Sequence, residues 1–399
     1  MEFVKDPDLL KVDINMSKLM SIGLISILIL LSCSDQSNQK STGHIANPSG
    51  FEIYRGINIS HWLSQTGPWA PRKTFFTKAD VKLIDSLGFD HIRLPIDEEI
   101  LWHEDGTINE ESFQYVKNCL DWCAEYGLRV VVDLHILRSH HFNARNNEGK
   151  MTLWVDTAAQ NNFIRLWENL SQFLKEYSND MVAYELMNEP VAPDNEQWNV
   201  LIHRAIEVIR EKEPNRVIIF GSNRWQKPFT FPYLKIPQND KNIILSFHTY
   251  HPYFVTHHKA FWSPARFYEG PVNYPGQCIP DSAWAKYVDT TNVPLMSRLK
   301  EENARGFYNK DTLLKIIKPA IDKAKAYGLQ LYCNEFGSLP TISEDMRLRY
   351  YQDVTDNFRE NDIVWANWDY KGNFGIVKWD SENEKTSEPN LKLVKILTE

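Results

Sequence analysis

The sequence is short of cysteine and has no long run of charge of one sign. Its five cysteines, among 399 residues, match neither a zinc-binding pattern nor a CxxC redox pair. The formal net charge of −8 argues against a nucleic-acid partner, because phosphate backbones are bound by basic surfaces. Four cysteines follow residue 33 and are expected to have no chemical function: Cys119, Cys123, Cys278 and Cys333.

Several catalytic motifs are also absent. The sequence contains no HExxH, GxSxG or P-loop pattern, and no glycine-rich turn follows an early β-rich run. These absences exclude the common metalloproteases, esterases and nucleotide-binding enzymes. Neighbours in sequence rarely bind one ion, so no metal site is expected at the two pairs of adjacent histidines, His140/His141 and His257/His258.

Residues 19–31 form an apolar run that is too short to span a bilayer and has the length of a signal-peptide core. The run leads into the letters LLSC, which resemble the lipobox of bacterial lipoproteins, where the cysteine becomes the lipidated first residue. The sequence therefore predicts a lipoprotein signal peptide over residues 1–33, with a possible start at Met16 and a lipid on Cys33.

Residues 34–50 are rich in Ser, Asn, Gln and Gly, and this composition predicts a flexible tether. Residues 51–399 then form the folded domain. A lipid anchor with a tether attaches a domain to a membrane without spanning it. We expect a protein of the bacterial cell envelope, anchored at the outer membrane or in the periplasm; the alternative is a secreted protein.

From residue 51 onward, β-rich runs alternate with amphipathic helical stretches, as in the βα units of a parallel sheet. Helices are expected at residues 77–87, 109–126, 160–177, 196–212 and 310–327. Eight parallel strands close most simply into a single-domain (β/α)8 TIM barrel, and the rival is an open doubly wound sheet. The candidate strands are FEIYRGINIS, FDHIRLPI, LRVVVDLH, MVAYELMNEP, NRVIIFGSN, NIILSFHTY, LQLYCNEFG and DIVWANWDY.

One connection after the sixth strand, residues 252–309, is much longer than the others and shows little regular structure, which usually marks a functional loop. The candidate strands are apolar until their C-terminal ends, where a polar or aromatic side chain appears. Catalytic residues of barrels lie at that face. In chain order these residues are Asn58 and His61, Arg93, His135, Asn188 and Glu189, Asn223, His248 and Tyr250, Glu335, and Trp368.

Two of these strand-end residues are glutamates, Glu189 on the fourth candidate strand and Glu335 on the seventh. Two carboxyl groups that face each other can divide the work of cleaving a glycosidic bond, since one protonates the leaving oxygen and the other attacks or stabilises the sugar. The competing interpretation is a structural ion pair, for example between Glu335 and Arg93. Glu185 has the strand parity of Glu189 but lies one layer deeper, and is interpreted as a structural hydrogen-bonding group.

The sequence resembles glycoside hydrolase family 5 between residues 51 and 377. The motifs that carry the resemblance are IRLPI, VVVDLH, NEP, SFHTYHP and NEFG. The resemblance implies a retaining enzyme without a metal or organic cofactor, in which Glu189 is the acid/base and Glu335 the nucleophile. It also implies that Arg93 lies against the nucleophile and keeps it ionised.

The resemblance further implies a carboxyl separation of about 5–5.5 Å and a ring of substrate-binding side chains around the sugar at the cleavage point. This ring contains His135, Asn188, His248 and Tyr250, with Trp368 stacked beneath the sugar. Aromatic side chains often bind sugar rings, so five further tryptophans are candidate platforms: Trp62, Trp69, Trp225, Trp262 and Trp284.

From this resemblance, the preferred interpretation is a monomeric, lipid-anchored endo-β-1,4- or mixed-linkage glucanase acting on polysaccharides or oligosaccharides. The alternatives in the same family are an exo-β-1,3-glucanase, a mannanase and a xyloglucanase. From a different class, the alternative is a surface glycan-binding lipoprotein that keeps the barrel but has no turnover. Because both glutamates are present, the enzyme is favoured over the binding protein.

Overall fold

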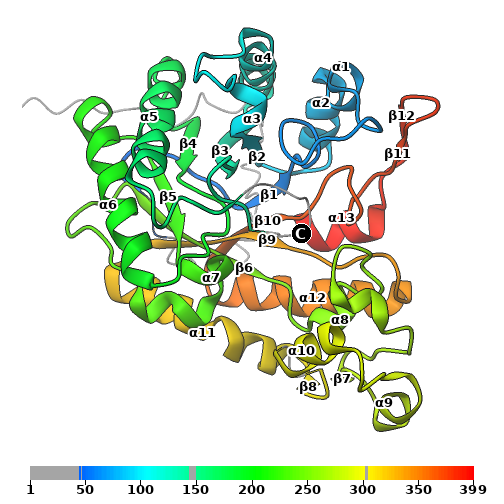
Figure 1. The fold of residues 1–399 in the computed structure, drawn as a ribbon. Coiled ribbons are helices and arrows are strands. Elements are labelled where there is room, and N and C mark those ends of the chain that lie inside the picture. Colours follow the sequence, from blue (N-terminus) through cyan, green and yellow to red (C-terminus); the bar gives the residue numbers. More distant parts are fainter. Residues whose placement is uncertain (1–44, 46, 143–149, 302–303) are drawn as a thin grey trace, which may run out of the picture. The chain divides into compact units, whose positions relative to one another are not determined.

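A closed barrel of parallel strands forms the centre of the fold (Figure 1). The computed structural model describes residues 45, 47–142, 150–301 and 304–399. Within these ranges, eight strands lie in the order β1-β10-β9-β6-β5-β4-β3-β2. Their bounds are β1 Arg55–Asn58, β2 His91–Asp97, β3 Arg129–Ile136, β4 Val182–Glu185, β5 Ile218–Gly221, β6 Ile243–Thr249, β9 Gln330–Phe336 and β10 Ile363–Asn367.

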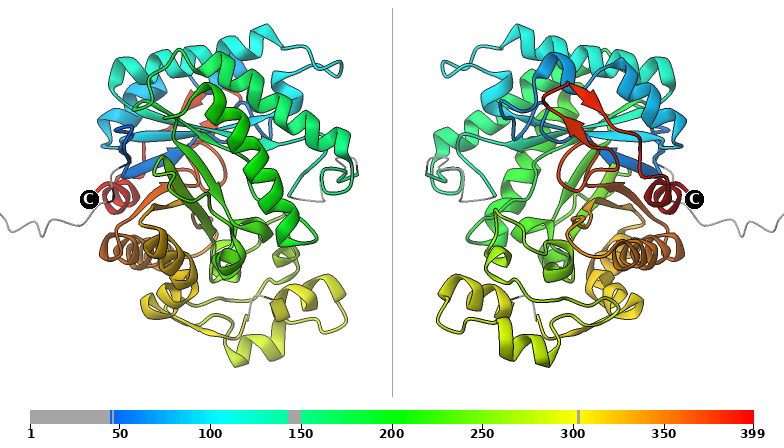
Figure 2. Two further views of the ribbon diagram at one scale, coloured as in Figure 1. Left: turned by 90° about the vertical axis from the view of Figure 1, so that its left-hand side faces the viewer. Right: turned by 90° about the vertical axis from the view of Figure 1, so that its right-hand side faces the viewer.

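The barrel closes because β1 pairs in parallel with both β2 and β10. The (β/α)8 barrel is therefore confirmed, and the open doubly wound sheet is excluded, since an open sheet would leave two edge strands. Helices cover the outside of the barrel in both views of Figure 2. The covering helices are α2 Lys78–Ser86, α4 Glu110–Tyr126, α5 Thr157–Leu174, α6 Asn195–Lys212, α11 Lys310–Tyr327 and α12 Glu344–Glu360.

The ends of these helices follow from local capping. The Asn109 side chain accepts a hydrogen bond from the Ser112 amide at the start of α4, and Gly127 ends the helix with a φ of 72°. Helix α5 begins three residues earlier than expected, because the Asp156 side chain accepts from the Ala158 amide and caps the helix there. Shorter elements complete the domain: α1 Arg72–Phe75, α3 Glu98–Leu101, α7 Asn223–Gln226, η2 Pro228–Tyr233, β11 Trp379–Asp380, β12 Lys385–Thr386 and α13 Leu391–Thr398.

The inside of the barrel changes from apolar to polar along the strands. One buried apolar cluster contains Val131, Ala183 and Tyr332. The residues two positions further along the same strands are Asp133, Glu185 and Asn334, all fully buried. Side chains two apart point to one face of a strand, so a polar layer lies directly above the apolar one, toward the C-terminal ends.

Residues 252–309 differ from the expected irregular loop, because their described part, 252–301 and 304–309, contains four short helices and a two-stranded sheet. The longest of these helices has nine residues, too few to give a clear periodicity in the sequence. The elements lie together at one side of the barrel in Figure 2. They are α8 Tyr253–Thr256, η3 Pro264–Phe267, β7 Gly276–Gln277, α9 Asp281–Tyr287, α10 Val293–Glu301 and β8 Phe307–Tyr308.

The predicted signal peptide and Cys33 lie outside the described residues, as does most of the predicted tether. Within the described ranges, none of the helices combines the length and the apolar character that crossing a bilayer requires.

Candidate active site

Arg93 lies at the centre of the polar layer, fully buried on β2. Its Nε and Nη2 donate to the two carboxylate oxygens of Glu185 at 2.7 and 2.9 Å. Nη2 also lies 2.9 Å from Asp133 Oδ2, and Nη1 donates to Glu335 Oε1 at 2.7 Å. Burial disfavours the charge of Arg93, but the three carboxylates hold its pKa well above its ordinary value.

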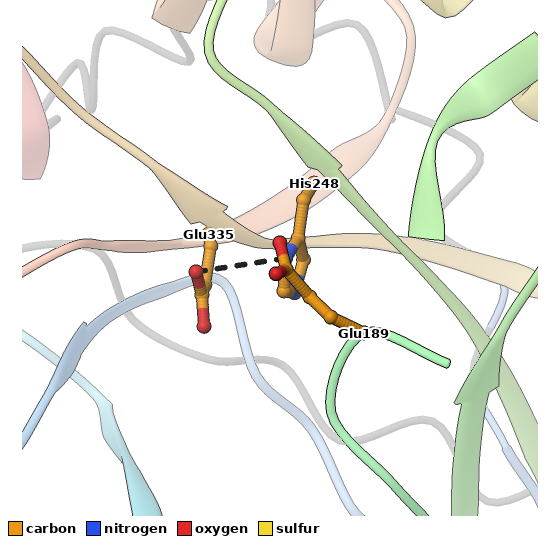
Figure 3. Close-up of side chains that lie close together, drawn as sticks. All are labelled: Glu189, His248 and Glu335. Atoms are coloured by element: carbon orange, nitrogen blue, oxygen red, sulfur yellow. Dashed lines mark hydrogen bonds and ion pairs between the residues drawn. The ribbon is translucent and has the colours of Figure 1, made fainter. Parts of the chain in front are cut away.

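Glu189 and Glu335 meet above Arg93. Glu189 follows β4 with a φ of 44°, and Glu335 is part of β9. One carboxylate oxygen of each glutamate and a ring nitrogen of His248 all lie within 4.8 Å of one another (Figure 3). His248 Nδ1 is 2.8 Å from Glu189 Oε1 and 3.5 Å from Glu335 Oε2, and the Tyr250 hydroxyl donates to Glu335 Oε2 at 3.0 Å.

The surroundings of the two carboxyl groups differ in charge. Burial raises the pKa of Glu189 to about 8, against the weaker opposing effect of Lys227 and other cations. Burial also raises the pKa of Glu335 above its ordinary value, while His248 and Arg93 lower it. Arg93 therefore lowers the pKa of Glu335, as expected. In the free protein, burial raises this pKa by more than Arg93 lowers it.

The histidines of the site are neutral near pH 7. Burial lowers the pKa of His248 to about 4 and that of His135 to about 3. His135 Nδ1 lies 2.6 Å from Asp133 Oδ2, and its ring stacks parallel to the Trp368 indole at a centroid distance of 5.7 Å. Three of the predicted site residues each have a buried nitrogen without a hydrogen-bond partner within the described part of the chain, and a ligand could bond there: His135 Nε2, Asn188 Nδ2 and His248 Nε2.

A cavity of about 710 Å³ opens above these groups. Its floor contains Glu189, Glu335 and Trp368, and one wall comes from the segment 252–309 through residues such as Trp262 and Arg298. The volume and the mixture of aromatic and polar side chains suit a sugar ligand.

The structure brings all eight of the predicted catalytic and substrate-binding residues together. Arg93 and Asn188 lie beneath the cavity, where Arg93 Nη2 donates to Asn188 Oδ1 at 2.9 Å. Asn58 also lies beneath it and accepts from Arg93 Nη1 at 3.0 Å. The other six line the cavity: His135, Glu189, His248, Tyr250, Glu335 and Trp368.

The five candidate tryptophan platforms differ in whether they lie at the cavity. Trp225 and Trp262 line the cavity. Trp69 is 41% exposed and lies beside His61, a lining residue, with ring centroids 5.0 Å apart. The prediction for Trp62 is wrong, because this indole is fully buried against Phe76 and belongs to the core. Trp284 lies on α9 and does not line this cavity.

Asp133 was not among the predicted site residues, although it contacts both Arg93 and His135. Its position two residues before His135 on one strand was the available signal, because the two side chains share a face. Lys227 and Arg298 also line the cavity and were not predicted, because their positions depend on how the connections after β5 and β6 fold. Glu185 is a hydrogen-bonding group as interpreted, since it accepts from Arg93 and Asn334.

Within the described ranges, one group of side chains could hold a metal ion, and it is Glu189, His248 and Glu335. The histidine pairs have other contacts: His140 Nε2 accepts from the Val191 amide, and His258 bonds the carbonyl of Gly270. The four cysteines after residue 33 are buried.

Two facing carboxyl groups at the C-terminal mouth of a (β/α)8 barrel are the arrangement with which glycoside hydrolases of this fold cleave a glycosidic bond. The family model described as Cellulase (glycosyl hydrolase family 5) matches residues 46–374. The chain belongs to glycosyl hydrolase family 5.

Curated relatives support this assignment. The chain is 34% identical to Endoglucanase C of Acetivibrio thermocellus over 351 residues, which cover 86% of this chain and 97% of that protein. It is 28% identical to Cellodextrinase A of Ruminococcus flavefaciens, over 78% of this chain and 83% of that protein. A structure of Thermotoga maritima Cel5A in complex with cellobiose has the same fold, with a TM-score of 0.65, 21% identity and coverage of 86% and 97%.

Proposed function

We propose that the protein is a retaining endo-β-glucanase that cleaves β-1,4- or mixed-linkage glucans by double displacement. The observation that carries the proposal is the approach of the two carboxyl groups, with oxygens of Glu189 and Glu335 within 4.8 Å of each other. Retaining glycosidases have carboxyl groups about 5–5.5 Å apart, whereas inverting enzymes need about 6.5–9.5 Å to admit a water molecule.

In the first step, Glu189 protonates the glycosidic oxygen while a Glu335 oxygen attacks the anomeric carbon. The bond to the leaving sugar breaks, and a covalent glycosyl ester on Glu335 forms. A pKa of about 8 keeps Glu189 protonated at neutral pH, as an acid requires. Arg93 and Tyr250 each contact one Glu335 oxygen and hold the carboxylate in place for attack.

In the second step, Glu189 has lost its proton and acts as a base. It takes a proton from water, the water oxygen attacks the anomeric carbon, and the ester to Glu335 breaks. The sugar at the cleavage point is held by the stacked Trp368 ring, and its hydroxyl groups bond the unpartnered nitrogens of Asn188 and His135. The β-configuration is restored, because the anomeric carbon is inverted twice.

The glucan substrate is inferred from the names of the relatives, which are endoglucanases and a cellodextrinase. The alternatives in the family have some support of the same kind. A yeast relative with 27% identity over 52% of this chain is named a glucan 1,3-beta-glucosidase, and the Thermotoga maritima enzyme was also solved with mannotriose.

A glycan panel tests the proposal. The purified protein is incubated with cellulose derivatives, mixed-linkage glucan, β-1,3-glucan, mannan and xyloglucan, and product lengths and anomeric configuration are measured. We expect oligosaccharides of several lengths from the first two substrates, with β-configured new ends and no loss of turnover in EDTA. Glucose as the sole early product would indicate exo-action, and binding without turnover would indicate a glycan-binding protein.

We also propose that the enzyme is attached to the cell envelope through Cys33. The support is the apolar run of residues 19–31 followed by LLSC. Expression of the full chain in a bacterium with labelled fatty acid, beside a Cys33→Ser variant, tests this. The variant should carry no fatty-acid label and should no longer be found in the membrane fraction. A label that persists in the variant would contradict the proposal.

A further inference from the structure

Glu189 belongs to a group of four residues with a rare backbone conformation. Its φ is 44°, and three consecutive residues after β5 also have positive φ: Arg224 at 58°, Trp225 at 62° and Gln226 at 50°. Residues other than glycine seldom adopt this region, and such residues cluster at functional sites where the surrounding structure holds them.

The contacts of Gln226 explain what holds Glu189. The Glu189 amide donates to Gln226 Oε1 at 3.0 Å. Gln226 Nε2 donates to Ser246 Oγ at 2.8 Å and approaches Glu185 Oε1 at 3.4 Å. The fully buried Gln226 side chain therefore joins the acid/base residue to β4 and β6 through three contacts.

Two further features support a fixed position for this side chain. The Trp225 amide donates to the Pro190 carbonyl at 3.1 Å, so the turn is bonded to the chain on both sides of Glu189. Gly221 leaves space for this side chain, because a Cβ at residue 221 would come 2.4 Å from the Ser246 carbonyl oxygen and 2.5 Å from Gln226 Cγ. A larger residue at position 221 would have to displace Gln226 or the backbone of β6.

We propose that Gln226 is a positioning residue that holds the acid/base Glu189 in its productive orientation. This inference rests on the proposed function, since it assumes that Glu189 donates the proton to the leaving oxygen. Without the bond from Gln226, the Glu189 backbone relaxes from its left-handed conformation, and its carboxyl group moves away from the glycosidic oxygen. A displacement of about 1 Å in an active site can cost about 10²-fold in rate.

The test compares two substrates that differ in their need for an acid. Dinitrophenyl cellobioside releases its phenolate without protonation, whereas a soluble β-glucan needs a proton on the leaving oxygen. In Gln226→Met, which keeps the side-chain volume, kcat/KM for the glucan should fall about 10–100-fold. For the aryl glycoside it should fall less than about 3-fold, because kcat/KM reports only the first step.

A second variant, Gln226→Glu, tests whether a hydrogen-bond acceptor at this position is sufficient for activity. It keeps an acceptor for the Glu189 amide, so most of the glucan activity should return. Asn223→Ala is the matched structural control. Asn223 bonds the amide and carbonyl of Ala192 in the same pair of segments without touching Glu189, so any loss should be equal for both substrates.

The outcomes distinguish a failure of the positioning role of Gln226 from a failure of the proposed glucanase activity. Equal losses on both substrates in Gln226→Met, or no loss at all, would overturn the positioning role. If Gln226→Met does not fold, Ser246→Ala, which removes the partner of Gln226 Nε2, decides by the same comparison of substrates. If the unmodified enzyme hydrolyses neither substrate, it is the proposed function that fails.

Discussion

Glu335 is surrounded by groups that would keep their other partners if its charge were removed. Arg93 retains Glu185 and Asp133, and the Tyr250 hydroxyl can donate to an amide oxygen. Glu335→Gln should therefore lower kcat by roughly 10⁴-fold or more through loss of the nucleophile, with Tm unchanged or higher. Turnover of cellodextrins and calorimetry measure the two effects. A fall in Tm of many degrees would instead make Glu335 a structural ion-pair partner.

Replacing Arg93, unlike replacing Glu335, should destabilise the protein, because Arg93 contacts three buried carboxylates. Arg93→Met removes the cation and leaves Asp133, Glu185 and Glu335 without it. Breaking a buried pair in this way costs about 3–5 kcal/mol, and urea unfolding should show a loss of this size. Glu196→Gln, at an exposed pair with Lys235, is the control and should leave the midpoint of urea unfolding nearly unchanged.

The pH dependence of activity follows from the two glutamates. Activity on glucan needs Glu189 protonated, so kcat/KM should fall as pH rises through about 8. It also needs Glu335 ionised, and burial places the acid limb above the ordinary glutamate value. Lys227→Met removes the largest opposing effect on Glu189 and should move the alkaline limb upward. A limb that stays in place would show that Lys227 does not act on Glu189.

At the scale of elements, the barrel strands could be predicted because each is a β-rich run that ends in a polar residue. Asn188, Glu189 and Glu335 were found in this way. The segment 252–309 could not be described from its sequence, since its helices are short and its position depends on tertiary contacts. Arg298 of α10 lies over the Tyr253 ring at 3.7 Å in the cavity wall, and no sequence period predicts such a contact.

The left-handed turn that carries Gln226 was also beyond the sequence. Arg224, Trp225 and Gln226 favour no positive φ by themselves, and the conformation exists because bonds to Pro190 and Glu189 hold it. Trp62 was misjudged for a related reason. Its indole Nε1 donates to the Arg72 carbonyl inside the core, and only the folded structure shows that this loop residue is buried.

The C-terminal end of helix α4 gives a prediction at the scale of elements. Gly127 ends α4 with a φ of 72°, and no atom lies within 4 Å of the place where a Cβ would be added. Gly127→Ala should therefore lower stability by about 1–2 kcal/mol through backbone strain alone, with unchanged kcat. Denaturant unfolding measures the loss, and equal stability would mean that the helix end adopts another conformation without cost.

At the scale of the whole molecule, buried carboxyl groups set the dependence of stability on pH. Burial raises the pKa of Asp97 and Glu189 to about 8 and that of Asp133 to about 7. In the unfolded chain these groups are ionised above pH 5. At these three groups the folded state therefore binds more protons than the unfolded state between pH 6.5 and 8, and their contribution to stability falls as pH rises.

The buried histidines act at lower pH. Burial lowers the pKa of His135, His140 and His257 to about 3, so below pH 6.5 protons bind the unfolded chain first. Their contribution makes stability fall as pH decreases, which opposes the effect of the carboxyl groups there. In the unfolded chain each histidine is still about half protonated at pH 6.5, so this opposing contribution fades with rising pH and is nearly gone by about pH 7.5. From about pH 7 upward the carboxyl effect dominates.

Urea unfolding at pH 7, 7.5, 8 and 8.5 should show a loss of a few kcal/mol, on the order of one for each buried carboxyl group. Glu189→Gln removes one of the three groups and should reduce the slope by roughly a third. Glu196→Gln, whose exposed carboxyl group is ionised in both states, should leave the slope unchanged. Stability that is constant or rises across this window would mean that Asp97, Asp133 and Glu189 are already ionised in the folded protein, and the acid role of Glu189 would lose its physical basis.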